Sequence, residues 1–154
     1  MDHCNVHPSF KSKPVYELRC RVCESLLCVR GMRAILLADR NVELYSTDLP
    51  PPGALLVLGS DYETENCRCR ISDAACGKCG IVVGYHVTLP CQSCLSSCNN
   101  GHLWMYNAAD ISATERLDTN GDGIMVWARI PVCSDDMGMR PQSQIAADWV
   151  ECCR

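Results

Sequence analysis

Two pairs of cysteines carry the clearest chemical signal in the chain. Cys20 and Cys23 form one C-x-x-C motif. Cys76 and Cys79 form another, and Gly80 follows it directly. Two residues between thiolates let a tight turn direct both sulfur atoms at one tetrahedral ion, with Zn–S distances of about 2.3 Å, and a glycine after the second ligand permits the backbone of such a turn. The two pairs therefore predict a closed four-thiolate zinc site, which is structural because a catalytic zinc keeps an open position.

A second group of cysteines lies farther along the chain. If residues 66–73 and 81–89 pair as a hairpin around the Cys76–Cys79 turn, the start of the first strand comes to lie beside the end of the second. The preferred second site then has four ligands: Cys67, Cys69, Cys91 and Cys94. The alternative set is local: Cys91, Cys94, Cys98 and His102. The sequence does not separate these two sets, nor does it exclude that only part of the group binds metal.

The composition favours a domain that metal helps to hold together. The 154 residues include 14 cysteines and a single Phe, and the cysteines are counted in the apolar share of 47%. The ordinary apolar core is therefore thin for one domain of this length. Residues 1–14 are polar and lack the apolar stretch of a signal peptide. We expect a reducing compartment, where paired cysteines more often bind metal than form disulfides.

Other classes of partner and chemistry find little support. A net charge of −4 argues against a uniformly basic nucleic-acid surface. The longest apolar runs, residues 34–38 and 54–58, are far shorter than the roughly 20 residues of a membrane helix. Phosphate-binding loops, H-E-x-x-H and G-x-S-x-G are absent. A partial calcium loop begins at Asp118, but Arg129 stands where a bidentate Glu is needed, so we interpret it as a polar turn.

The remaining pattern predicts a mainly β protein with one or two short helices toward the C-terminus. Strands are expected over residues 15–18, 54–58, 66–71, 81–89, 103–106 and 124–130, and a hairpin over residues 32–38 and 42–45. Helices are expected over residues 110–117 and 141–150. The chain should divide into a flexible leader (1–13), a zinc-binding β domain (14–140) and a C-terminal helix or tail (141–154). The first zinc would join distant parts of a sheet, because the gap between Cys23 and Cys76 is too long for one compact finger.

Three aromatic residues are candidates for contact with a protein partner. Trp127 is the first choice, and Trp104 and Tyr106 share one face of an expected strand. Exposed Trp and Tyr are typical anchors of interfaces, whereas packing in the core is the alternative for each residue. We interpret His86 as a hydrogen-bonded histidine of a strand rather than a ligand.

Several segments, spread over about residues 16–131, resemble the Ugene family, also called family with sequence similarity, member seventy-two. The most specific is Pro-Cys-Gln-Ser-Cys-Leu-Ser-Ser-Cys-Asn-Asn-Gly-His-Leu-Trp-Met, at residues 90–105. The others are residues 30–39, 44–50, 67–69, 76–80, 83–86, 116–118 and 126–127. The paired C-x-x-C motifs, with Gly84 and Tyr85, also resemble the Yippee and Mis-eighteen type of zinc β-tent.

The resemblance implies a fold and a function. A β-tent consists of two antiparallel sheets that one zinc holds together at their apex. Ugene-family members bind a nuclear uracil-DNA glycosylase and antagonise it, which implies a non-enzymatic adaptor of the nucleus and cytoplasm that acts on DNA repair. In this interpretation, the second cysteine group is an addition to the single zinc site of an ordinary β-tent.

Two alternatives belong to other functional classes. Methionine sulfoxide reductases of the B type also carry paired C-x-x-C zinc motifs, and Cys133 would then be the catalytic thiol. Their GWPSF-like and RYCIN-like segments are absent, and no base is clearly placed to activate Cys133. The third reading is a β-tent module that recognises a peptide or a small ligand.

Overall fold

The computed structural model describes residues 8–36, 39–65, 67–96 and 100–131. The described strands are β1 (Tyr16–Cys20), β2 (Leu26–Leu36), β3 (Asp39–Thr47), β4 (Ala54–Leu56), β5 (Tyr62–Glu63), β6 (Arg70–Cys76), β7 (Val82–Leu89), β8 (Trp104–Asn107) and β9 (Ile111–Glu115). The described helical segments are short: η1 (Pro8–Ser12), α1 (Gln92–Ser96) and η2 (Trp127–Arg129). The chain is therefore mainly β, as predicted. Among these residues no helix has the length and apolarity of a membrane span.

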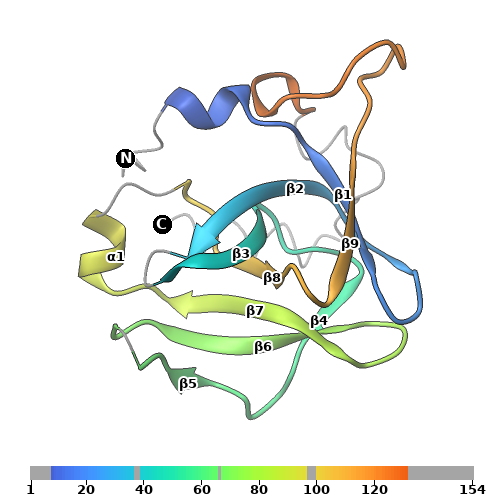
Figure 1. The fold of residues 1–154 in the computed structure, drawn as a ribbon. Coiled ribbons are helices and arrows are strands. Elements are labelled where there is room, and N and C mark those ends of the chain that lie inside the picture. The colour runs from blue at the N-terminus through green and yellow to red at the C-terminus, as the bar shows by residue number, and fades with distance from the viewer. Residues whose placement is uncertain (1–7, 37–38, 66, 97–99, 132–154) are drawn as a thin grey trace.

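One continuous path of antiparallel pairing runs through the strands in the order β4-β6-β7-β8-β3-β2-β1-β9, and β5 pairs with β6. The long strand β2 takes part in two pairings. Its residues up to Gly31 pair with β1, and its residues from Met32 onward pair with β3. The sheet thus curls from β4 round to β9, and β2 joins its two parts (Figure 1).

The core lies where strands from both parts of the sheet meet. Its fully buried large side chains include Leu18 of β1, Leu27 of β2, Val83 of β7 and Tyr106 of β8. Each such aliphatic side chain contributes roughly 1.5–3 kcal/mol through the apolar area that it removes from water. Gly84 allows close packing beside it, because a Cβ there would lie 1.9 Å from the carbonyl oxygen of Met105.

Several predicted elements hold in the structure. Residues 32–36 and 39–45 form the predicted hairpin, as parts of β2 and β3. The strands expected at residues 15–18, 81–89 and 103–106 correspond to β1, β7 and β8. Part of the expected leader, residues 8–12, forms η1. The next residue is also in contact with the domain, because the Lys13 ammonium donates a hydrogen bond to the carbonyl of Arg33 at 3.0 Å.

Two local predictions are wrong, and two are confirmed only in part. Residues 111–115 form β9 rather than a helix, because all five pair with β1. The stretch 124–130 is not a strand, since Ile124 forms only an isolated bridge with Leu117 and Trp127–Arg129 is a 3-10 helix. Of the segment 54–58, expected as a buried strand, only Ala54 is buried, and β4 ends at Leu56 at the margin of the sheet. The strand expected at 66–71 begins only at Arg70. The helix expected over 141–150 lies outside the described residues.

Candidate metal centres

Two tight turns with the same backbone pattern present the first four cysteines. At the end of β1, the N–H of Glu24 donates to the carbonyl of Cys20 at 2.9 Å. At the end of β6, the N–H of Gly80 donates to the carbonyl of Cys76, also at 2.9 Å. The residue after the second cysteine has a positive φ in both turns, 62° at Glu24 and 80° at Gly80. Each C-x-x-C motif therefore closes into a turn that directs its two sulfur atoms the same way.

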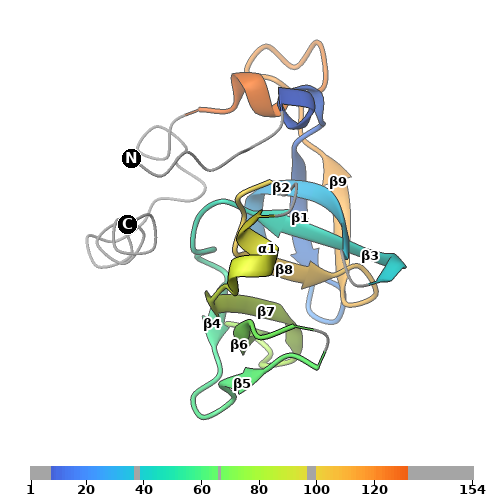
Figure 2. The same ribbon diagram turned by 90° about the vertical axis from the view of Figure 1, so that its left-hand side faces the viewer.

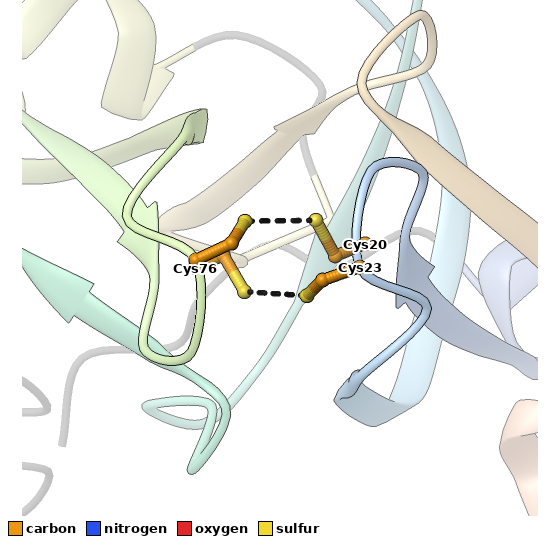
Figure 3. Close-up of side chains that lie close together, drawn as sticks. Cys20, Cys23 and Cys76 are labelled. Carbon is orange, nitrogen blue, oxygen red and sulfur yellow. Dashed lines mark hydrogen bonds between the residues drawn. The ribbon is translucent and has the colours of Figure 1, made fainter.

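The two turns face each other across the curl of the sheet. Figure 3 shows Cys20 and Cys23 on one side and Cys76 on the other. The Sγ atoms of Cys20 and Cys79 lie 3.6 Å apart, as do those of Cys23 and Cys76, and all four lie within 4.8 Å of one another. Thiolates about 2.3 Å from one tetrahedral ion are about 3.8 Å from each other. The four sulfur atoms therefore have the spacing that a zinc ion requires.

The first site also closes the curled sheet. In the strand order, β7, β8, β3 and β2 lie between β6 and β1. The cysteines at the ends of β6 and β1 nevertheless share one site. Near it, the N–H of Gly53 donates to the carbonyl of Leu27 at 3.3 Å, and the N–H of Gly77 donates to the carbonyl of Gly53 at 2.9 Å. A zinc ion at this point crosslinks the two parts of the sheet.

Polar groups around the first site lower the pKa of Cys23 and Cys76 and so favour their thiolate forms. The Ser25 hydroxyl lies 3.0 Å from the sulfur of Cys23 and 3.2 Å from that of Cys76. Burial raises the pKa of Cys76, but hydrogen bonds from Ser25 and from the backbone of Cys79 and Lys78 outweigh it and lower this pKa to about 6. The thiolate is the form that binds metal.

Cys79 shows why these sulfur atoms need a cation. A hydrogen bond from the backbone N–H of Ile81 lowers its pKa, but burial and the three neighbouring cysteines raise the pKa further, to about 11. A fourth negative charge beside the other sulfur atoms is unfavourable without a positive ion between them. A divalent cation removes this repulsion, so the donor set fits zinc in its charge as well as in its spacing.

The second site lies at the other end of the β6–β7 hairpin. The structure brings Cys67, Cys69, Cys91 and Cys94 together, with their sulfur atoms within 4.8 Å of one another. The first two precede β6, Cys91 follows β7, and Cys94 belongs to α1. The backbone N–H of Cys91 donates to the sulfur of Cys69 at 3.3 Å, which fixes the two halves against each other.

The second site has the same electrostatic character as the first. Hydrogen bonds, first from the backbone of Cys94 and then from that of Arg68, lower the pKa of Cys91 to about 6 against the effect of burial. Burial and the neighbouring sulfur atoms raise the pKa of Cys94. The Thr64 hydroxyl lies 2.9 Å from the sulfur of Cys67, as Ser25 lies beside Cys23 in the first site.

A model of the family described as Yippee homolog 2 zinc finger protein matches residues 7–153. The chain belongs to this family. Together with the two four-cysteine groups, the match makes this chain a zinc-stabilised module with two zinc sites. Both groups are four-thiolate sets with no fifth candidate ligand among the described residues, which is the composition of structural rather than catalytic zinc.

The alternative ligand set for the second site is not assembled around His102. Its Nδ1 lies 2.8 Å from the Ser46 hydroxyl, and its ring lies 4.8 Å from that of Trp127. Burial lowers the pKa of His102 to about 4. Cys98, the other member of that set, lies outside the described residues, as does Cys133. His86 is the strand histidine that the sequence indicates, buried and 3.3 Å from the carbonyl oxygen of Leu103.

The three aromatic candidates occupy different environments. Tyr106 is 1% exposed and belongs to the core, so its assignment to a partner surface is wrong. Trp104 is half-buried and stacks on the His86 ring at 4.1 Å. Trp127 is half-buried in η2, and the Arg30 guanidinium lies 5.9 Å from the centre of its ring. The two tryptophans thus keep part of their surface in contact with solvent.

Sequence reasoning missed the residues that support these features. Ser25 and Thr64 contact ligand sulfur atoms, and only their position two or three residues from a cysteine hints at this role. Buried Arg30 forms a two-pronged ion pair with Asp48, at 3.0 and 2.8 Å, and donates to the carbonyl of Pro131 at 2.6 Å. This arrangement holds the segment after η2 against β2, and no local sequence motif predicts it.

The segment at Asp118 is the polar turn that the sequence indicates. Its carboxylate oxygen Oδ1 accepts hydrogen bonds from the backbone N–H groups of Asn120 and Asp122, both at 3.1 Å. These bonds stabilise the turn, so the role of the carboxylate is to accept hydrogen bonds from the backbone of its own turn.

Proposed function

We propose that this zinc-stabilised domain is a non-enzymatic adaptor of the nucleus and cytoplasm that binds a nuclear uracil-DNA glycosylase and antagonises it. The observation that carries the proposal is the placement of residues 90–96 and 100–105, the described parts of the segment with the most specific resemblance to the Ugene family. This segment supplies Cys91 and Cys94 to the second site and Trp104 to β8. The resemblance therefore falls on the parts of the chain that zinc and the sheet hold in place.

The composition of the metal sites supports an adaptor rather than an enzyme. Each site offers four thiolates to one ion, which leaves no position for a substrate or an activated water. Zinc here supplies rigidity. A rigid surface binds a partner with less loss of conformational entropy than a flexible one.

Trp127 is the proposed anchor of the interface. It is half-buried in η2, and the Arg30–Asp48 ion pair beside it fixes the position of this region. A large aromatic ring that is held by the fold and still partly open to solvent has the properties of an interface hot spot. Trp104 is the second candidate, since it is also half-buried.

A binding measurement tests the proposal. The zinc-loaded chain and the nuclear uracil-DNA glycosylase of the same organism are titrated by calorimetry, with Trp127→Ala and the control Leu89→Ala, which truncates another exposed side chain. We expect binding by the wild type, a loss of at least about tenfold in Trp127→Ala, and no change in the control. Zinc content and far-UV circular dichroism establish that each variant is folded.

A functional assay tests the antagonism. Uracil excision by the glycosylase should slow as the adaptor approaches an equimolar amount, and Trp127→Ala should have less effect. Absence of binding by the folded wild-type chain would remove the proposal. Reduction of methionine sulfoxide that is lost in Cys133→Ser would support the thiol-enzyme alternative instead.

A further inference from the structure

The margin of the sheet at β4 carries an unusual run of exposed apolar side chains. Leu55, Leu56, Val57 and Leu58 are 62%, 42%, 37% and 96% exposed. The run includes two strand residues and continues beyond β4. Open sheet margins are usually protected by charged side chains or proline, because an unpaired strand readily pairs with another chain. No such residue interrupts the segment 54–58.

Among the described residues, the side of β4 that faces away from β6 has no strand partner at Leu56. Leu55 is paired with Ala75 of β6, and the N–H of Val57 donates to the carbonyl of Asp73 at 2.8 Å. Since successive residues of a strand direct their backbone groups to opposite sides, the N–H and C=O of Leu56 point away from β6. That side is the end of the described strand order, and Figure 2 shows β4 at the margin of the sheet.

We propose that two copies of this chain associate through their β4 margins as an antiparallel pair with its two-fold axis at Leu56. In this register the N–H and C=O of Leu56 bond reciprocally with those of Leu56 in the second copy. A two-fold axis requires a surface that is complementary to itself, and this pairing makes one continuous sheet from two copies.

The side chains of the segment match one another in this register. Leu56 lies beside its own equivalent and Leu55 lies beside Val57, while exposed Leu58 follows directly in the turn after Val57. Every cross-strand neighbour is therefore apolar, so pairing covers the exposed run on both faces of the sheet. If the two-fold axis moved by one residue, to Leu55 or Val57, the backbone groups facing the second copy would be those already bonded to β6. The pairing with β6 therefore places the axis at Leu56 rather than at either neighbour.

Charge complementarity also favours a second copy. Exposed Lys78 lies in the turn next to the Ala54 end of the strand, where Ala54 pairs with Cys76. Near the other end lie three carboxylates, those of Asp61, Glu63 and Asp73, with Arg70 as the partner of Asp61. An antiparallel pair brings the positive end of each copy against the negative end of the other, which favours association.

Sedimentation equilibrium of the full zinc-loaded chain tests the proposal over a range of concentrations. We expect a reversible dimer of twice the 17.0 kDa chain mass. Leu58→Lys should weaken it by at least about tenfold, because it places a charge next to the apolar pairing. The matched control Leu89→Lys, at a residue 59% exposed and away from β4, should leave the dimer unchanged.

Two further variants test the register and the charges. Leu56→Pro removes an outward N–H together with the leucine side chain on the axis and keeps the bonds to β6, so it should weaken the dimer while zinc content and circular dichroism stay unchanged. Lys78→Glu should weaken the dimer, and Lys78→Glu combined with Glu63→Lys should restore most of the affinity. A chain that stays monomeric at every concentration overturns the proposal. So does a dimer that Leu58→Lys leaves intact, or that Leu89→Lys weakens equally.

Discussion

The sulfur atoms of Cys20 and Cys79 lie 3.6 Å apart, although 59 positions of the sequence separate them. This contact joins the end of β1 to the turn after β6, two strands that are remote from each other in the order of the sheet. The first metal site thus closes the curl of the sheet, together with the backbone hydrogen bonds of Gly53 to Leu27 and Gly77. Several consequences for stability can be measured.

Removal of zinc should unfold the domain. A four-thiolate site contributes on the order of 10–16 kcal/mol of apparent binding free energy near neutral pH, which is as large as the net stability of a typical domain. We expect a high-affinity zinc chelator to abolish the cooperative thermal transition followed by circular dichroism, and added zinc to restore it. A chelated chain with the melting temperature of the zinc-loaded protein would contradict this role.

Single replacements of ligands should separate the two sites by zinc stoichiometry. We expect native mass spectrometry to find two zinc ions in the wild type and one in Cys94→Ser, because that residue belongs only to the second group. Cys76→Ser should lose the other ion together with cooperative folding, since it opens the curl. The control is Cys28→Ser, a buried cysteine outside both groups, which should retain two ions.

The two cysteine turns differ at one position, and this difference predicts a stabilising substitution. Glu24 has a φ of 62°, where the equivalent position in the other turn is Gly80 with a φ of 80°. A residue with a Cβ is strained in this region by about 1 kcal/mol. Glu24→Gly should therefore raise the free energy of unfolding by about 1 kcal/mol, as measured by urea denaturation.

The reverse substitution in the second turn provides the control. A Cβ added at Gly80 meets nothing within 4 Å, so Gly80→Ala changes the conformational preference without a steric clash. It should destabilise the domain by about 1 kcal/mol. Equal stability of Glu24→Gly and the wild type, with unchanged zinc content, would show that the first turn carries no such strain.

His102 should make stability depend on pH in the acid range. Burial lowers its pKa to about 4, from an ordinary value of 6.5 in the unfolded chain. Because the unfolded chain takes up the proton first, this contribution is fully present above about pH 6.5 and is lost as the pH falls toward 4. We expect a loss of about 2 kcal/mol between pH 8 and pH 5.

A paired measurement isolates the histidine from the thiolates, which also bind protons in acid. Urea unfolding of the wild type and of His102→Asn is compared at pH 8 and pH 5, and the asparagine keeps a polar atom for the Ser46 hydroxyl. The difference between the two proteins should shrink by about 2 kcal/mol at the lower pH. A difference that does not depend on pH would show that His102 titrates normally in the folded state.

The cysteine spacing determined much of the site in advance. Two residues between sulfur atoms define a turn that closes on itself, so each C-x-x-C motif acts as a local chelating unit. The hairpin between Cys69 and Cys91 also follows from counting positions outward from the Cys76–Cys79 turn. These predictions succeeded because they depend on short stretches of backbone and on the alternation of a strand.

Residues whose environment is set by remote strands were predicted less well. The segment 111–115 contains the helix formers Ala113 and Glu115, but pairing with β1 makes it extended, because hydrogen bonds along a whole strand outweigh a weak local preference. Tyr106 and Trp104 share a strand face, yet the first is buried and the second is half-buried. The curl of the sheet covers one residue more than the other.

The sequence by itself determined that this protein is mainly β and that its cysteines form paired metal-binding turns, since spacing and alternation are local properties of the backbone. Only the tertiary structure decided that β4 lies at an open margin, that Tyr106 belongs to the core, and that β1 meets the end of β6. Those outcomes depend on which strands become neighbours. That choice is made by the burial of the whole chain and by the metal that closes the sheet, and no single segment encodes it.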